Sequence, residues 1–333
     1  MPRPRRRACD HGPGRLAVGM LLGASLGCSA SRNLYLVVVP VADLRTHPSA
    51  PAPVGTHDDT EESQLLYGER VRLKQTQGDW ALVEAIEQDE WTHHHRWEGY
   101  PGWIERAALA PLPDGTHPPN DAVITSSWAT LWRDPDLTET ALRLPMGAAL
   151  TVTGSAMGER WHALLPTGEA PWISRGHFAL DEELGRRSSD QRRALVMRSA
   201  QALLGDPYLW GGRSAHTDAL PNPTGLDCSG LVNVAYRTAG ISLPRDAHEQ
   251  YLRSRRIVRL QPADLIFLSA PDAPDRIVHV MLYAGNDELI EGPGTGQPIR
   301  RIRAFDRLGR SLRGMTPGQR IERQTVFFGS YLN

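Results

Sequence analysis

The stretch that decides the fold of the C-terminal half is Asp227-Cys228-Ser229-Gly230-Leu231, followed by apolar residues at helical spacing up to Ala239. This spacing predicts a helix that begins at Cys228 and that Gly240 closes at its C-terminus. Asp227 is the expected N-cap, while Ser229 and Gly230 keep the first turn small enough for a substrate backbone to approach. Because a helix N-terminus favours a thiolate, Cys228 is a candidate nucleophile; a buried structural cysteine is the alternative.

A histidine and a glutamate follow on two expected strands. Residues 277–283 alternate in polarity, which places Val278 on the most aliphatic face and turns His279 to the other. A hairpin centred on Gly285 would pair His279 with Glu291, whose carboxylate could then fix the imidazole tautomer. The pattern predicts that these two residues complete a triad with the cysteine, and a solvated His/Glu pair without catalysis is the alternative.

The order of elements indicates an α+β domain over residues 190–333. A helical pattern up to about residue 204 precedes the cysteine helix, and later segments read as strands. These segments are 264–268, 277–284, 288–291 and 325–331. Helices followed by an antiparallel sheet are typical of an α+β domain.

Two stretches nearer the N-terminus repeat one plan of short β-type runs. The landmarks are Leu44 to Pro48 against Leu131 to Pro135, Asp79 to Val83 against Arg160 to Leu164, and Pro101 to Ile104 against Ala170 to Ile173. Their shared order predicts two small all-β barrels, over 33–114 and 118–182. The order resembles that of bacterial SH3-like domains. We expect the tryptophans of these strands to be barrel core; they are Trp80, Trp103, Trp161 and Trp172.

The first thirty residues, 1–30, have the pattern of an export signal, with a basic start and an apolar run that is too short to span a bilayer. Ser25-Leu26-Gly27-Cys28 resembles a lipoprotein cleavage box, in which Cys28 would carry the lipid. Ordinary cleavage near Ala30 is the alternative, because Ser25 stands where such boxes usually have Leu. We expect an exported protein, periplasmic or anchored to the membrane as a lipoprotein.

Composition narrows the function further. The chain has 333 residues, a net charge of -1 and three cysteines, of which only Cys228 falls in the expected folded body. A lone exported thiol cannot form an internal disulfide, and the near-zero charge gives no attraction to nucleic acid. The run His93-His94-His95 cannot place all three imidazoles on one ion in a regular strand. We therefore expect no metal, no cofactor and a monomer.

Five ordered blocks resemble the NlpC-type peptidases, a papain-like cysteine peptidase family of bacterial cell walls. They are Tyr208 to Gly212, Asp227 to Leu231, Pro244 to Asp246, Pro262 to Phe267 and His279 to Tyr283. With two SH3-like domains ahead of them, the chain is most similar to the γ-D-glutamyl-L-diamino-acid endopeptidases, also called dipeptidyl-peptidase VI. The resemblance implies a multidomain fold, with two small all-β SH3-like barrels followed by an α+β papain-like catalytic domain.

The resemblance also implies a substrate. The expected reaction is hydrolysis of the bond between γ-D-glutamate and diaminopimelate or lysine in peptidoglycan-derived peptides with a free N-terminal L-alanine. Asp227 could pair with the substrate's α-ammonium, Tyr208 would help to bind the oxyanion, and Glu69 and Tyr100 of the first β domain would wall the site. Glu291 stands where many relatives have His, a change that keeps the orienting role.

Two rival functions stay open from the sequence. The same residues could serve an amidase or acyltransferase that acts on another amide. The tandem β domains could instead belong to a cell-wall-binding module whose papain-like domain is inactive.

Overall fold

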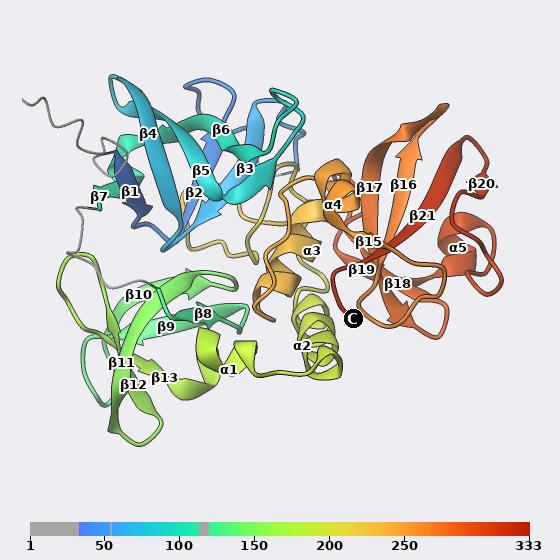
Figure 1. Ribbon diagram of the computed structural model, residues 1–333. Coiled ribbons are helices and arrows are strands. Elements are labelled where there is room, and N and C mark those ends of the chain that lie inside the picture. The colour runs from blue at the N-terminus through green and yellow to red at the C-terminus, as the bar shows by residue number, and fades with distance from the viewer. Residues whose placement is uncertain (1–32, 54, 113–119) are drawn as a thin grey trace, which may run out of the picture.

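The computed structural model describes residues 33–53, 55–112 and 120–333, which form three seven-stranded antiparallel sheets (Figure 1). In Figure 1 the first sheet lies at the upper left, the second below it and the third at the right, with helices α2 (Ser189–Ala202) and α3 (Cys228–Arg237) between them. The expected export segment, with Cys28, lies outside the described residues. In the part that is described, no helix is long and apolar enough to cross a membrane.

The first two sheets are copies of one plan. The first contains β1 (Leu34–Val37), β2 (Val41–Arg45), β3 (Glu61–Leu66), β4 (Arg70–Gln77), β5 (Trp80–Glu90), β6 (Glu98–Glu105) and β7 (Leu109–Pro111). The second contains β8 (Ala122–Ile124), β9 (Trp128–Trp132), β10 (Thr140–Pro145), β11 (Ala149–Met157), β12 (Arg160–Leu164), β13 (Trp172–Ser174) and β14 (Phe178–Leu180). Short 3-10 helices, Arg106–Ala108 and Arg175–His177, precede β7 and β14.

Strand order confirms the repeat but not a closed barrel. The first sheet runs β3-β2-β6-β5-β4-β1-β7 and the second β10-β9-β13-β12-β11-β8-β14, so each strand matches the one seven places earlier. Both orders are open paths, and the prediction of closed barrels is wrong in this respect. All four tryptophans are half-buried, and Trp161 packs against the core of the second unit. The other three, Trp80, Trp103 and Trp172, directly precede a buried residue and so face away from the core, because neighbours along a strand face opposite sides.

The C-terminal part is an α+β domain, as predicted. Its helices are α1 (Asp181–Gly185), α2, α3, α4 (Ala247–Arg253) and α5 (Ala304–Leu308). Its strands are β15 (Arg255–Arg256), β16 (Leu265–Ala270), β17 (Ala273–Gly285), β18 (Glu288–Glu291), β19 (Arg300–Arg303), β20 (Arg320–Ile321) and β21 (Gln324–Ser330). The sheet order is β15-β21-β16-β17-β18-β19, with β20 paired to β21. One face of this sheet packs against α2 and α3, while α5 helps to cover the other.

A bulge in β17 changes the expected alternation around His279. Leu268 pairs with His279, but the next residue of β16, Ser269, pairs with Ile277, so Val278 is an extra residue on its strand. Val278 is accordingly 45% exposed, whereas Ile277 and Val280 are buried in the core. The prediction that Val278 shares the aliphatic face is therefore wrong. Such bulges re-aim side chains next to functional sites, and this one precedes His279 directly.

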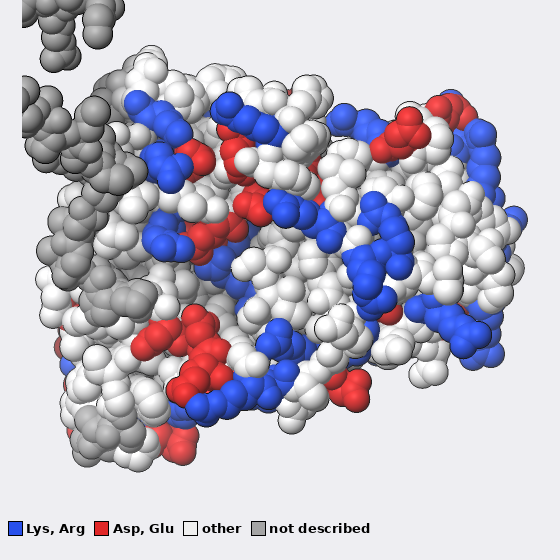
Figure 2. Space-filling model, in the orientation of Figure 1, with Lys and Arg blue, Asp and Glu red and all other residues white. Residues whose placement is uncertain are grey.

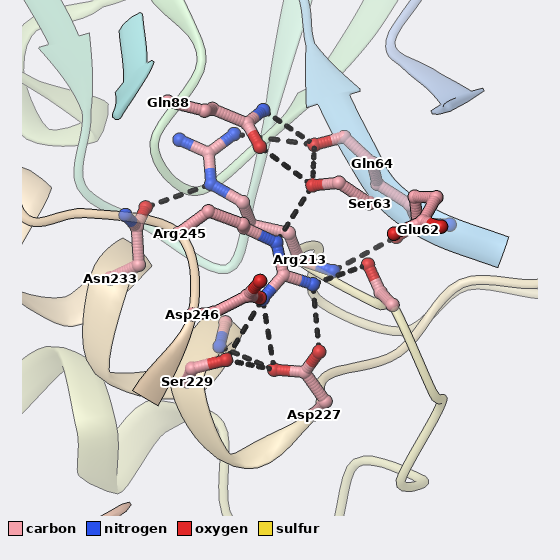
Figure 3. A network of polar contacts seen from close by, with 12 residues as sticks. Glu62, Ser63, Gln64, Gln88, Arg213, Asp227, Ser229, Asn233, Arg245 and Asp246 are labelled. Atoms are coloured by element: carbon pink, nitrogen blue, oxygen red, sulfur yellow. Dashed lines mark hydrogen bonds and ion pairs between the residues drawn. The ribbon is translucent and has the colours of Figure 1, made fainter. Parts of the chain in front are cut away.

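Buried polar side chains join the first β unit to the C-terminal domain (Figure 3). The Gln64 side chain accepts from the Arg213 amide at 3.1 Å and donates to the Pro223 carbonyl at 2.9 Å. Arg245 donates from Nε to Ser63 Oγ at 2.7 Å. On the face shown in Figure 2, basic and acidic side chains are interspersed, in keeping with the net charge of -1. The first unit is therefore held against the domain that carries the cysteine by specific hydrogen bonds.

Candidate active site

Cys228 is the first residue of α3, as the sequence predicts, and it is half-buried. Asp227 caps the helix, with its Oδ1 accepting from the Gly230 amide at 2.6 Å. The amides of the first turn and the positive end of the helix dipole act on the sulfur, an environment that favours the thiolate. The helix terminus and its cap thus prepare Cys228 as a nucleophile.

His279 contacts both partners that the sequence predicts for it. Its Nε2 lies 3.0 Å from Glu291 Oε2, and its ring also interacts with the side chain of Cys228. Burial opposes a charge on the imidazole, but interaction with the Cys228 thiolate and the bond to Glu291 outweigh it and raise the pKa of His279 to about 9. His279 is therefore a cation at neutral pH, and a cation beside a cysteine favours a nucleophilic sulfur.

The route by which Glu291 reaches His279 differs from the expected one. Leu282 pairs with Ile290, a register that continues with Glu291 across from Met281 rather than from His279. The predicted register is wrong by two residues, because the turn consists of Asn286 and Asp287, with Gly285 paired to Glu288, and is not centred on Gly285. Diagonal neighbours on a sheet lie within reach of long side chains, and the glutamate spans this distance.

Two arginines hold the other side of Glu291. Arg300 donates from Nη2 to Glu291 Oε1 at 2.7 Å, and Arg307 donates from Nε to Oε2 at 2.9 Å. The carboxylate is fully buried. Burial alone would raise its pKa, but His279 and Arg307 together lower the pKa of Glu291 to about 2. Glu291 is therefore ionised whenever the protein is folded at ordinary pH.

Asp227 and Ser229 are largely committed to structure (Figure 3). Arg245, which is completely buried, donates to both oxygens of Asp227 and to Ser229 Oγ, at 3.2, 2.7 and 2.9 Å. Ser229 Oγ in turn donates to Asp227 Oδ1 at 3.0 Å. Both residues lie beside the nucleophile as expected, but a substrate ammonium would have to share a carboxylate that already neutralises a guanidinium.

The acidic residue of β3 and its following turn that contacts Tyr100 is Glu62 and not Glu69. Tyr100 Oη lies 2.9 Å from Glu62 Oε2 and 3.0 Å from Asp246 Oδ2, which brings β3, β6 and the N-terminus of α4 together. Glu69 is 1% exposed and pairs with Arg213 at 2.7 Å. This burial contradicts the expectation that Glu69 walls the site.

Sequence reasoning missed Glu62 although a local signal existed. In the run Glu61-Glu62 on β3, the side chains face opposite sides, and Glu61 is buried against Arg45. Glu62 must then face the other way, toward Tyr100. Recognising it as a site residue also required knowing that β3 faces α4, which depends on the packing of two domains.

Tyr208 also lies near the cysteine. Burial raises the pKa of its phenol, and the nearby Asp227 and Cys228 raise it further. A neutral hydroxyl in this position can donate a hydrogen bond to a developing oxyanion. The placement supports the oxyanion role that the resemblance implies for Tyr208.

The histidine run does not converge on one point. His94 alone of the three lies with Glu90 and Glu98 in a group whose ligand atoms are within 4.8 Å of one another. His94 is hydrogen-bonded to Glu98, which Arg96 also contacts at 2.7 Å.

Comparisons with known proteins agree with this geometry. Residues 205–309 match the NlpC/P60 family. A γ-D-glutamyl-L-lysine dipeptidyl-peptidase of Bacillus cereus is 27% identical over 261 residues, which cover 74% of this chain and 72% of that protein. The peptidoglycan endopeptidase RipB of Mycobacterium tuberculosis is 34% identical over 144 residues, which cover 40% of this chain and 54% of that one.

A solved structure extends the likeness to the whole fold. The crystal structure of an NlpC/P60 family protein from Bacillus cereus superposes with a TM-score of 0.71 at 22% identity, over 90% of this chain and 100% of that one. The β units and the α+β domain therefore share one arrangement with that protein. The part of this chain that matches the NlpC/P60 family, residues 205–309, is therefore the part that carries Cys228, His279 and Glu291.

Proposed function

We propose that this chain hydrolyses the bond between γ-D-glutamate and a diamino acid, diaminopimelate or lysine, in peptidoglycan-derived peptides with a free N-terminal L-alanine. The observation that carries the proposal is the interaction of Cys228 and Glu291 with His279, together with two carboxylates around Tyr100, one of which Arg245 links to Asp227. Cys228 supplies the nucleophile and His279 the base, and the carboxylates around Tyr100 supply a binding site for a cation.

The reaction follows from the positions of the side chains. The Cys228 thiolate attacks the γ-carbonyl carbon of glutamate, and the resulting oxyanion is stabilised by the Cys228 amide and the Tyr208 hydroxyl. Imidazolium His279 then gives its proton to the leaving amine of the diamino acid as the C–N bond breaks, which leaves a thioester. Neutral His279 takes a proton from water, hydroxide attacks the thioester, and the thiolate is released.

The Tyr100 cluster suits an ammonium group. A phenol has one proton, so it can donate to Glu62 or to Asp246 but not to both, and one carboxylate keeps a free acceptor. Burial raises the pKa of Asp246 to about 7, as do Glu249 and Asp227, while Arg245 lowers it. A bound cation would relieve this crowding of negative charge, which supports recognition of the free α-ammonium of L-alanine.

The names of the relatives support the same bond. Two proteins named γ-D-glutamyl-L-lysine dipeptidyl-peptidase, from Bacillus cereus and Bacillus subtilis, each match about three quarters of this chain at 27% identity. Residues 1–30 have the basic start and short apolar run of an export signal, so we extend the proposal to export through this segment. Mass spectrometry of the membrane fraction would reveal whether Cys28 carries lipid.

Digestion of defined peptides tests the proposed function. L-Ala-γ-D-Glu-L-Lys, its diaminopimelate counterpart, the same peptides with an acetylated N-terminus, and intact sacculi should be incubated with wild type and with Cys228→Ser. We expect L-Ala-D-Glu and the free diamino acid from the unblocked peptides with wild type alone. Products of another mass would favour the amidase or acyltransferase, and no turnover of any substrate would favour the wall-binding module.

A further inference from the structure

The environment of Glu291 contains more positive charge than a catalytic pair needs. Arg300 contacts Glu291 Oε1 through both Nε (3.1 Å) and Nη2 (2.7 Å), and Arg307 Nε lies 3.1 and 2.9 Å from the two carboxylate oxygens. The carboxylate is fully buried, while the two guanidinium side chains are 36% and 26% exposed. The arginines come from β19 and α5, so two separate elements converge on one side chain.

Charge counting shows why this matters for the reaction. The thiolate of Cys228 and the imidazolium of His279 sum to zero, and a buried carboxylate would add an uncompensated negative charge. That charge would hold the proton on His279 too firmly. Hydrolysis of the thioester requires neutral imidazole to accept a proton from water, so this second step would suffer most.

We propose that Arg300 and Arg307 are positioning residues for the proposed reaction: they fix the Glu291 carboxylate on His279 Nε2 and offset its charge, so that the imidazole can release its proton during thioester hydrolysis. The proposal rests on the proposed function for the step that it names, but the charge coupling itself concerns only side chains of this chain. It also explains how a carboxylate can serve as the third residue of the triad.

The remaining groups near His279 do not supply this compensation. Cys228 of α3 is negative when active, and Tyr208 is a phenol held neutral by burial. His248 of α4 accepts a hydrogen bond from the Ile277 amide at 3.2 Å, and burial lowers its pKa, which keeps it neutral. Among the described residues whose contacts reach Glu291, the positive charge other than the imidazolium comes from Arg300 and Arg307.

A double-mutant cycle with residue 291 separates positioning from general stability. Arg300→Met/Arg307→Met should be made in the wild-type background and in Glu291→His, with Arg301→Met as the matched control. Arg301 lies on the same strand and is 37% exposed, but it pairs with Glu288 on the surface. A neutral third residue needs no compensating cation, so the arginine substitutions should matter only when residue 291 is glutamate.

In the wild-type background, we expect kcat to fall roughly 10–100-fold, as for the loss of one charge-assisted hydrogen bond, with KM little changed and the acyl-enzyme visible by intact mass. The alkaline limb of Cys228 alkylation by iodoacetamide should move to higher pH. The conservative variant Arg300→Lys/Arg307→Lys should restore much of kcat and much of the wild-type pH profile of alkylation. In the Glu291→His background, the double arginine substitution should change kcat less than threefold. The control substitution Arg301→Met should likewise change kcat less than threefold in the wild-type background.

Two results would overturn the proposal. One is an equal loss of kcat in the wild-type and Glu291→His backgrounds, which would mean that the arginines only support the fold. The other is an unchanged alkylation profile in the double variant. Failure of wild type to cleave any peptide would count against the proposed function. The charge coupling could still be tested by the pH profile of Cys228 alkylation, because alkylation needs no peptide substrate.

Discussion

At the scale of single residues, Glu62 and Tyr100 test the recognition of a free amino terminus. Glu62→Gln removes a charge from the cluster while keeping its shape, and a charge-assisted hydrogen bond is worth about 1.5–3 kcal/mol. We expect kcat/KM for L-Ala-γ-D-Glu-L-Lys to fall about 10–100-fold, with little effect on hydrolysis of any N-acetylated peptide. Steady-state kinetics on the two substrates would measure this, and an equal loss on both would contradict the ammonium site.

The His279–Glu291 pair predicts a pH window for stability. Glu291 has its pKa lowered from 4.5 to about 2, so its contribution is present above 4.5 and is lost as pH falls through about 2. His279 has its pKa raised from 6.5 to about 9, so its contribution is complete below 6.5 and is lost as pH rises through about 9. Urea unfolding of wild type and Glu291→Gln should therefore differ most between pH 4.5 and 6.5. A difference that is constant from pH 2 to 10 would argue against the pair.

The residue types of the triad could be predicted from the sequence, but not all of their surroundings. Cys228 was marked by its place after a helix cap, and His279 and Glu291 by their strands. No sequence pattern marked Arg300 or Arg307, because nothing local shows that β19 and α5 meet at one carboxylate. Glu69 was expected to wall the substrate site because of its position in the chain. In the structure Glu69 is buried and pairs with Arg213 and Arg237.

At the scale of elements, the N-terminus of α3 carries the chemistry. Asp227→Ala removes both the cap and the partner of buried Arg245, so it should destabilise the protein by about 3–5 kcal/mol, as expected when a buried pair is broken. Asp227→Asn keeps the cap and should cost less. Chemical denaturation of wild type, Asp227→Ala and Asp227→Asn would measure the free energy of unfolding of each. Equal values for the Asn and Ala variants would contradict this prediction.

Helix caps and strand existence were predictable at this scale, whereas register was not. Asp227 as N-cap and the strands near 264–268, 277–284 and 288–291 are confirmed. The register shifts of β17 could not be read from alternation, because a bulge depends on how neighbouring strands pair rather than on the residues of one strand. Yet the extra residue Val278 directly precedes His279, and the register with β18 places Glu291 diagonally to it.

At the scale of the whole molecule, the first β unit and the peptidase domain share buried charges. Glu69 pairs with Arg213 and Arg237, which hold its pKa below the usual value against the effect of burial. Glu69→Gln should lower the free energy of unfolding by about 3–5 kcal/mol without changing KM. Glu84→Gln is the matched control, since Glu84 pairs with Arg72 and Lys74 on the surface and should contribute about 0–1 kcal/mol. A changed KM with unchanged stability would return Glu69 to the substrate site.

The repeated strand order was visible in the sequence as repeated landmarks, but the docking of the units was not. Contacts such as Gln64 with Arg213 join residues far apart in the chain, and no local pattern announces them. The same docking brings Glu62 and Tyr100 of the first unit to Asp246, which pairs with Arg245. The proposed substrate site is therefore a property of the assembled molecule.

The central claim is that His279 activates Cys228, and the rate of Cys228 alkylation by iodoacetamide as a function of pH tests it most directly. In wild type we expect rapid alkylation already at pH 6, where the imidazolium holds the thiolate, and at least tenfold slower alkylation in His279→Ala. Equal rates in the two proteins from pH 5 to 8 would show that the imidazole does not act on the sulfur, and would contradict the account.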